Sequence, residues 1–143
     1  MKFITLIPAR KGSKSIKKKN IITIRNKPLI QYTFDQINKS KLSLKSSFVI
    51  TDDFQVKKIA KKNNINTEYI RPKSLSSDKT PLIRNILHFI NWADTREIKY
   101  DYIVILQPTS PLRSIADINK SIEIVSKKKS KCLVSISQSL EHP

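Results

Sequence analysis

The sequence contains little glycine, cysteine or acid. Its 143 residues include one Gly and one Cys, and 11 Asp and Glu residues stand against 28 Lys and Arg, for a formal net charge of +17. A single glycine excludes the Walker A loop and the G-x-G-x-x-G dinucleotide turn, because both contain more than one. A single cysteine excludes a disulfide within the chain and suits a reducing compartment. No apolar run approaches the roughly 20 residues of a membrane span or, near the N-terminus, the about 7–15 residues of a signal-peptide core. We therefore expect a cytoplasmic protein with no membrane partner.

The large positive charge raises the possibility of a nucleic-acid-binding protein. Most of the excess is lysine, however, and the lysines are spread along the chain on expected polar helix faces, as in residues 56–62. Tryptophan and tyrosine are sparse and are not interleaved with basic residues, which argues against a platform for stacking single-stranded bases. The distribution favours solvated lysines and no nucleic-acid partner, and a basic nucleic-acid-binding module stays as the alternative from another functional class.

Short apolar runs alternate with helical patterns along the whole chain. Strands are expected at residues 3–7, 48–50, 67–70, 102–106 and 133–136, with a further short strand over 21–24. Helices are expected from Pro28, from Asp52 or Asp53, from Thr80 as the N-cap, and from Ser114. Strands that alternate with helices on short connections form parallel sheets, and continuous apolar strands are typical of sheets with helices on both faces. The length predicts a single α/β domain over residues 1–143.

Three polar loops follow expected strands, over residues 8–20, 71–80 and 107–113. The carboxyl ends of parallel strands share one edge of a sheet, and ligands of open α/β sheets bind at that edge. We therefore expect the three loops to converge on one rim and to form the functional site there.

The first of these loops is strongly basic. It holds Gly12, the only glycine, which we expect to adopt positive φ or to leave room for a ligand. The candidate cations around this glycine are Arg10, Lys11, Lys14 and Lys19, and the short polar side chains include Ser13 and Asn20. Arg10 can bridge two phosphate oxygens with its planar guanidinium, and Lys19 can act as a point charge. A strand that leads into such a loop predicts phosphate binding, with charges left in solvent as the alternative.

Three blocks of sequence carry a family resemblance. They are residues 7–14 (IPARKGSK) with Lys19-Asn20, residues 71–78 (RPKSLSSD) and residues 106–113 (LQPTSPLR). In the same order, they resemble blocks of the CMP-sialic acid synthetases (N-acylneuraminate cytidylyltransferases), and the resemblance covers essentially the whole chain. It implies a Rossmann-like, three-layer nucleotidyltransferase fold with a mainly parallel sheet.

The resemblance also implies an activity. Members of this family transfer CMP from CTP to the anomeric hydroxyl of a nine-carbon α-keto acid sugar, with Mg²⁺ and with release of pyrophosphate. By motif match, Arg10 and Lys19 would be catalytic and would stabilise charge developing on phosphorus and pyrophosphate. The implied CTP-binding residues are Ala9, Arg10, Gly12, Ser13, Lys19, Asn20, Arg71, Ser77 and Thr80, with Arg71 at the cytosine. The implied sugar-binding residues are Gln107, Thr109 and Ser110.

The sequence departs from the family pattern at its C-terminal end. Family members continue into a segment that reaches a partner subunit, and then to carboxylates that hold the metal. This sequence ends at Pro143 and contains no Asp-x-Asp pair. We expect a fold truncated after the fifth strand, no metal ligand in this chain, and Mg²⁺ ligands beyond its end. A homodimer is expected for full-length relatives and is doubtful for this chain.

Several alternatives stay open. The chain is either part of an active enzyme or a catalytically inactive, truncated CTP-binding remnant. Within the enzyme class, the nearest alternative is the related Kdo cytidylyltransferases, although these typically have arginine at the position of Lys14. Sialic, legionaminic and pseudaminic acids are all open as the sugar.

Overall fold

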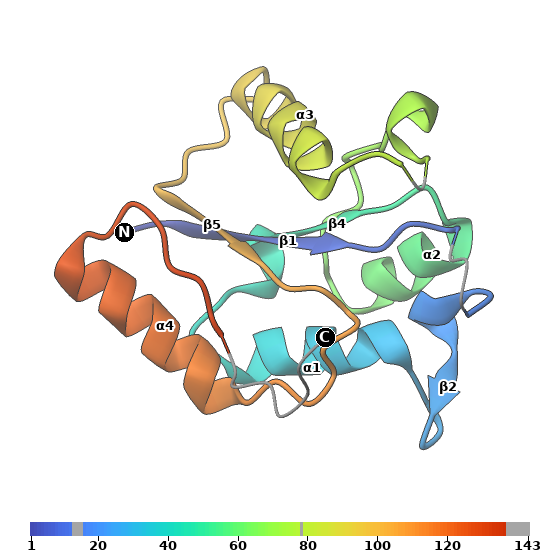
Figure 1. Cartoon of the computed structure of the whole chain (residues 1–143), viewed down its shortest axis with the longest axis horizontal. Helices are drawn as coiled ribbons and strands as arrows, with labels where there is room; N and C mark the ends of the chain where they lie inside the picture. Colours follow the sequence, from blue (N-terminus) through green and yellow to red (C-terminus); the bar gives the residue numbers. More distant parts are fainter. Residues whose placement is uncertain (13–15, 78, 137–143) are drawn as a thin grey trace, which may run out of the picture.

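The chain folds into three layers, with a parallel sheet between two layers of helices (Figure 1). This computed structural model describes residues 1–12, 16–77 and 79–136. The sheet contains β1 (Phe3–Pro8), β4 (Ser47–Ile50) and β5 (Tyr102–Ile105) in the order β4-β1-β5, and both pairs are parallel. Helix α3 (Leu82–Asp94) covers one face, and the other face carries α1 (Leu29–Lys39), α2 (Phe54–Lys62) and α4 (Ile115–Lys128). The predicted α/β fold with helices on both faces is confirmed.

Two apolar cores lie on the two faces of the sheet. Successive side chains of β1 point to opposite faces, so Leu6 packs on the α3 side and Ile7 on the α1 side. Phe89 of α3 is fully buried in the first core, and Phe34 of α1 is 1% exposed in the second. Burial of an aliphatic or aromatic side chain of this size contributes about 1.5–3 kcal/mol. The sheet and its carboxyl edge are therefore held rigidly between packed layers.

Side-chain caps begin two helices where the sequence predicts them. Asp53 Oδ1 accepts a hydrogen bond from the Gln55 N–H at 2.8 Å at the start of α2. Ser114 Oγ accepts one from the Asp117 N–H at 3.0 Å at the start of α4. Such caps satisfy N–H groups that have no partner inside the helix. The Asp53 cap follows the end of β4, and the Ser114 cap follows the loop after β5. The two caps therefore fix where the chain passes from the carboxyl edge of the sheet into a helix.

Shorter elements connect the main ones. β2 (Thr23–Ile24) and β3 (Lys27–Pro28) form a small antiparallel hairpin, and β2 falls within the predicted short strand. Arg25 and Asn26 in its turn have φ of 46° and 62°, as a two-residue type I′ turn requires. One-turn 3₁₀ helices are η1 (Lys19–Ile21), η2 (Leu44–Ser46) and η3 (Lys73–Leu75).

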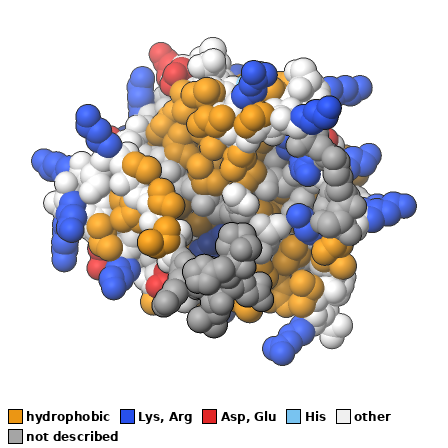
Figure 2. Space-filling view, in the orientation of Figure 1, with side chains coloured by type: hydrophobic (Ala, Val, Ile, Leu, Met, Phe, Trp, Pro, Cys, Tyr) orange, Lys and Arg blue, Asp and Glu red, His pale blue; other side chains and the backbone are white. Residues whose placement is uncertain are grey.

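Basic side chains are spread over the visible surface. On the face in Figure 2, Lys and Arg side chains surround the outline of the molecule and do not gather in one patch. On this face the distribution agrees with the prediction of solvated lysines. Within the described ranges, every helix is too short or too polar to cross a bilayer.

The strand predicted at residues 67–70 is wrong. In the described structure, a single parallel bridge joins Phe48 to Asn66 and no ladder follows it. Asn66 Oδ1 accepts a hydrogen bond from the Glu68 N–H at 2.8 Å, and this Asx turn directs the backbone away from β4. Tyr69 then packs into the core beneath α3. Tyr69 is therefore buried by this core contact and not by a place in the sheet, and Ile70 is 70% exposed.

The strand predicted at residues 133–136 is also wrong. This segment lies outside the sheet, with Val134 73% exposed and Ile136 93% exposed. An apolar β-branched run forms a strand only where a partner edge and a buried face are available to it. Among the described residues, the last strand along the chain is therefore β5. The expected fifth strand, over residues 133–136, is not part of the sheet.

One local expectation at the rim fails, and one of the two explanations offered for Gly12 is excluded. Helix α3 begins at Leu82 after Pro81 as the N-cap residue, because Pro81 still has an extended ψ of 143°. Thr80 is therefore not the N-cap, and its N–H donates to the Ser77 carbonyl at 3.1 Å. No glycine in the described ranges has positive φ, so positive φ does not explain Gly12. What Gly12 contributes is the absence of a side chain.

Candidate functional site

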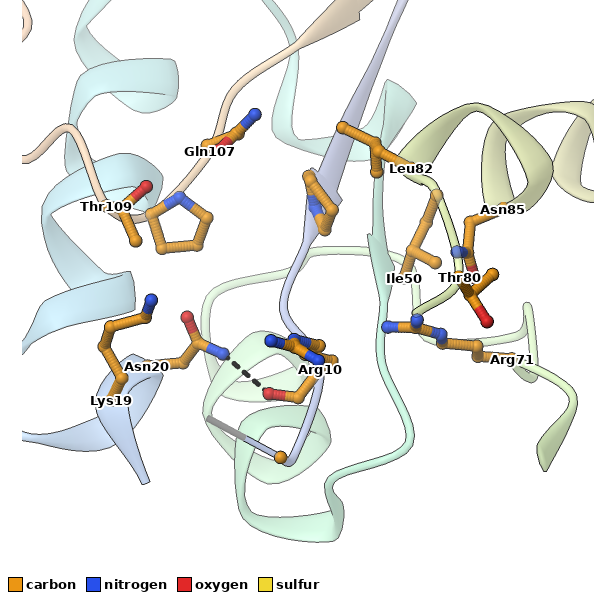
Figure 3. Close-up of a pocket in the computed structure, with 13 residues that line it drawn as sticks. Arg10, Lys19, Asn20, Ile50, Arg71, Thr80, Leu82, Asn85, Gln107 and Thr109 are labelled. Carbon is orange, nitrogen blue, oxygen red and sulfur yellow. Dashed lines mark hydrogen bonds between the residues drawn. The ribbon is translucent and has the colours of Figure 1, made fainter. Parts of the chain in front are cut away.

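A pocket of about 280 Å³ lies at the carboxyl edge of the sheet, where all three polar loops meet (Figure 3). Pro8 and Ile50 come from the ends of β1 and β4, and Gln107 follows β5. The described lining residues are Pro8, Arg10, Gly12, Lys19, Asn20, Ile50, Arg71, Thr80, Leu82, Asn85, Gln107, Pro108 and Thr109. The expected convergence on one rim is thus observed, even though the loop at 71–80 does not follow a strand.

The start of the basic loop is tied to the end of β4. The Ala9 N–H donates to the Ile50 carbonyl at 3.0 Å, and the Ala9 carbonyl accepts from Thr51 Oγ1. One residue past Arg10, the Lys11 N–H donates to Asp52 Oδ1 at 2.8 Å. These bonds hold the backbone on both sides of Arg10, so its side chain leaves a fixed base.

The end of the same loop is tied back to its start. Asn20 is 9% exposed, and its Nδ2 donates to the Arg10 carbonyl at 2.9 Å (the dashed line in Figure 3). Lys19 and Asn20 begin η1 and lie on the pocket wall beside Arg10. Gly12 lines the pocket between these two ends, where the lack of a side chain leaves the backbone accessible. The Asn20 bond therefore closes the loop around the pocket.

Arg71 supplies a buried cation on the other side of the pocket. It is 7% exposed, and its Nε donates to the Leu75 carbonyl at 3.1 Å, with Nη2 donating to the same oxygen. Burial lowers the pKa of Arg71 from its usual value, Asp52 opposes this shift, and the positive charge of Arg10 adds to it. An arginine stays protonated despite such a shift. Two guanidinium groups thus repel each other across one small space.

The charge of the pocket lining has one sign. Among its described residues are the cations Arg10, Lys19 and Arg71, and none of them is acidic. Positive groups held close together in a partly desolvated space are stabilised by an anion that neutralises them. The site is therefore built for a ligand with several negative charges.

A partly buried network holds the loop that follows β5. Arg113 Nη2 donates to the Gln107 carbonyl and Arg113 Nη1 to Gln36 Oε1, both at 3.0 Å. Gln36 of α1 is 8% exposed, and its Nε2 donates to the carbonyls of Pro111 and Arg113, each at 2.8 Å. Burial lowers the pKa of Arg113. This network positions Gln107 and Thr109 on the wall opposite α3.

Most residues singled out from the sequence line this pocket. Those on the wall are Arg10, Gly12, Lys19, Asn20, Arg71, Thr80, Gln107 and Thr109. Ala9 is 1% exposed in the core and anchors the loop instead, while Ser77 and Ser110 are exposed and outside the lining. Ser13 lies outside the described residues. The roles predicted for these residues stay predictions.

Sequence reasoning missed part of the wall. The additional residues are Pro8, Ile50, Leu82, Asn85 and Pro108. Four of these residues are apolar and border the loops already singled out. Asn85 is different, because it is a polar residue among the apolar positions Leu82, Ile86 and Phe89 on the inner stripe of α3. A polar residue in such a stripe is the signal that would have found it.

The described residues do not fit a metal site. No group of three His, Cys, Asp or Glu side chains within the described ranges can hold an ion, and Mg²⁺ requires oxygen ligands. Asp53 caps α2 and Asp52 accepts from the Lys11 N–H, so both carboxylates already have structural partners. Asp78 lies outside the described residues.

The carboxyl edge of a parallel sheet, where this cationic pocket lies, is the edge at which ligands of open α/β folds bind. A sequence profile of the cytidylyltransferase family matches residues 4–142. The chain belongs to this family, which confirms the resemblance seen in its three sequence blocks.

Curated relatives share about the same level of identity. The chain is 32% identical to an N-acylneuraminate cytidylyltransferase of Escherichia coli, over 96% of this chain and 32% of the relative. It is 30% identical to a CMP-N,N'-diacetyllegionaminic acid synthase of Legionella pneumophila, over 96% of this chain and 58% of the relative. It is also 30% identical to a pseudaminic acid cytidylyltransferase of Campylobacter jejuni, over 100% of this chain and 61% of the relative. The chain thus spans only part of the length of each relative.

Solved structures share the fold. A CMP:2-keto-3-deoxy-manno-octonic acid synthetase complexed with CTP matches with a TM-score of 0.70 and 20% identity, over 91% of this chain and 49% of the other. A cytidylyltransferase from Leptospira borgpetersenii matches with a TM-score of 0.68 and 22% identity, over 90% of this chain and 50% of the other. At these identities the likeness establishes the architecture.

Proposed function

We propose that this chain forms the CTP-binding part of an enzyme that transfers CMP from CTP to a nonulosonic acid. The single observation that carries the proposal is the pocket itself, because its described lining combines cations from two loops with no acidic residue. Family membership makes CTP the ligand of choice among polyanions. Relatives named for sialic, legionaminic and pseudaminic acids support the class of acceptor and leave its exact identity open.

In this proposal Arg10 and Lys19 bind the triphosphate. The hydroxyl oxygen of the sugar attacks the α-phosphorus and gives up its proton to solvent, the bond from the α-phosphorus to the α–β bridging oxygen breaks, and pyrophosphate leaves with the electron pair. Catalysis of phosphoryl transfer depends mainly on positioning and on stabilising the charge of the transition state. Arg10 suits this role because its planar group can bridge oxygens of the α-phosphate and of the leaving group. Hydrogen bonds to the backbone of Ala9, Arg10 and Lys11 hold the main chain from which that group extends.

The acceptor would lie against the wall that follows β5. Gln107 and Thr109 offer a carboxamide and a hydroxyl there, which suit the hydroxyl-rich surface of a sugar acid. The network through Arg113 and Gln36 fixes the backbone of this wall, so its polar groups are preorganised. Ser110 is exposed, and we place it at the outer edge of the sugar site.

Mg²⁺ would come with the triphosphate. Because no described residue of the pocket lining is a carboxylate, we propose that any protein ligands to the ion lie outside the described residues. We propose a homodimer for full-length members of the family and do not extend it to this chain, which spans 32% to 61% of the relatives named above. The roles proposed for Arg10 and Lys19 depend on neither the ion nor the dimer.

Calorimetric titration of the chain with CTP, GTP and ATP tests the proposal. We expect CTP to bind more tightly than either purine nucleotide, and we expect Arg10→Ala to weaken CTP binding by about 100-fold or more. Lys61→Ala, at an exposed position of α2, is the control for loss of one positive charge and should bind CTP normally. Equal binding of all nucleotides together with tight, salt-sensitive binding of random DNA would contradict the proposal and favour a nucleic-acid-binding module.

Turnover is tested separately. With CTP, Mg²⁺ and a nonulosonic acid supplied, an active enzyme releases pyrophosphate, and Arg10→Ala abolishes that release. CTP binding without any pyrophosphate release from this chain would identify a CTP-binding portion that needs residues from elsewhere for catalysis.

A further inference from the structure

Asn85 holds a buried oxygen atom that has no hydrogen-bond partner. The residue is 2% exposed on the inner face of α3, and its Oδ1 is fully enclosed and unsatisfied. Buried polar atoms are almost always paired, because the loss of water is otherwise uncompensated. The other such side-chain atom among the described residues is Thr33 Oγ1 in α1, and Thr33 does not line the pocket. Of the two, only Asn85 lies where a ligand could supply the missing partner.

The surroundings of Asn85 differ from the rest of the pocket. Figure 3 shows its side-chain amide directed from α3 toward Arg71 and Thr80. Ile50 and Leu82 supply apolar walls beside it. Apolar walls with a few polar groups suit the uncharged, ring-shaped part of a ligand, whereas Arg10 and Lys19 suit its charged part. This end of the pocket therefore fits a nucleobase.

We propose that Asn85 is a specificity-determining residue that reads the amino edge of the base. This inference rests on the function proposed above. With a turn of its side-chain amide toward the pocket, Asn85 Oδ1 accepts a hydrogen bond from the exocyclic amino group of cytosine and so gains the partner it lacks in the free protein. Uracil has a carbonyl oxygen at the same position, which offers Oδ1 no hydrogen to accept. A buried group that is left unpaired by the wrong ligand discriminates strongly against it.

The structure also predicts how stability responds. A residue kept only for packing or folding would be costly to replace. An unpaired buried oxygen kept for a ligand is a liability in the free protein, so its removal is neutral or stabilising. Asn85→Leu keeps a similar volume without polar atoms, and the free variant should melt at or above the temperature of the wild type. The stability of the free variant therefore separates a ligand-reading role from a purely structural one.

The test compares CTP with UTP by calorimetry, using the full chain and Asn85→Leu. We expect the variant to bind CTP about 10- to 100-fold more weakly, as for loss of a buried hydrogen bond, and the preference for CTP over UTP to fall toward one. Thr33→Val is the matched control, because it removes the other unpaired buried oxygen away from the pocket. It should change neither nucleotide affinity.

A CTP analogue without the exocyclic amino group provides a second measurement on the wild-type protein. The analogue should lose affinity for the wild type, and the same analogue should bind Asn85→Leu about as well as CTP does, because both changes remove one interaction. Two results would overturn this inference and leave the proposed function intact. One is that the affinity losses from the analogue and from Asn85→Leu add independently. The other is that Asn85→Leu still binds CTP, in a manner that depends on Arg10, with an unchanged ratio of CTP affinity to UTP affinity. A wild-type chain that does not bind CTP would overturn the proposed function and this inference together.

Discussion

The two ends of the pocket are built differently. Arg10 and Lys19, at the end formed by the basic loop, are only partly buried. Arg71 and Asn85, at the end beside α3, are 7% and 2% exposed. A partly solvated cation attracts any polyanion, whereas a buried polar group is left unpaired by the wrong ligand. The difference suggests that the first end sets how tightly a nucleotide binds and the second end sets which nucleotide binds.

Arg10→Ala tests this division most severely. We expect CTP affinity to fall by about 100-fold or more, because the variant loses hydrogen bonds from a guanidinium to charged phosphate oxygens. Affinity for UTP should fall by a similar factor, since both nucleotides carry the same triphosphate. Calorimetry with both nucleotides measures the two factors. A change of preference with little loss of affinity would contradict the assignment of Arg10 to the phosphates.

Arg71→Lys should have the next largest effect. Lysine keeps the positive charge but cannot reproduce the two hydrogen bonds from Nε and Nη2 to the Leu75 carbonyl. We expect about a tenfold loss of CTP affinity with reduced preference over UTP, and a loss of about 1–2 kcal/mol in the free energy of unfolding. Denaturant unfolding and calorimetry provide the two values.

The matched control for that substitution is Arg84→Lys, at an exposed position of α3. It should leave both the free energy of unfolding and the nucleotide preference unchanged. If Arg71→Lys also left the free energy of unfolding and the preference for CTP over UTP unchanged, the fixed geometry of the buried end would not contribute to nucleotide selection.

Lys19→Ala should have a smaller effect that depends on salt. We expect CTP affinity to fall by about 3- to 10-fold at low ionic strength and by less at high ionic strength, because dissolved ions screen a partly exposed charge. Titrations at two salt concentrations, with Lys61→Ala as the charge control, measure this. An equal loss at both concentrations would show that Lys19 acts as a desolvated group, like the residues of the other end.

Arg113→Lys should affect CTP least. The variant loses bonds to Gln36 and to the Gln107 carbonyl, so we expect the free energy of unfolding to fall by about 1–2 kcal/mol. CTP affinity should stay within about twofold, because this arginine contacts neither end of the proposed nucleotide site. Gln36→Leu, which removes the other half of the network, should behave in the same way. A large loss of CTP affinity in either variant would mean that the sugar wall also shapes the nucleotide site.

Much of this site could be predicted because its loops are marked locally. Arg10, Arg71 and Gln107 follow apolar runs, and an apolar run predicts a buried segment whether or not it forms a strand. The run at 67–70 illustrates the limit. It is buried through Tyr69, yet the Asx turn at Asn66 takes it out of the sheet. Its loop still reaches the rim, because burial of the segment before it is enough to place it there.

Asn85 could not be recognised in the same way. Periodicity places it on the inner stripe of α3 among apolar residues, where a polar side chain suggests only an unusual core position. Its meaning depends on Ile50 and Arg71, which are distant in the sequence and enclose it only after folding. The same holds for Gln36, whose side chain bonds the backbone at Pro111 and Arg113. No local pattern shows that such distant groups will meet.

The sequence by itself determined the α/β order, the cap at Ser114, a cap at either Asp52 or Asp53, and the charge of the basic loop. These depend on neighbours along the chain, through periodicity, local hydrogen bonds and composition. Tertiary structure decided which apolar runs found a partner strand, and which polar groups were cut off from water. Burial arises from contacts between elements far apart in sequence, so only the folded chain distinguishes the partly solvated cations Arg10 and Lys19 from the enclosed pair Arg71 and Asn85.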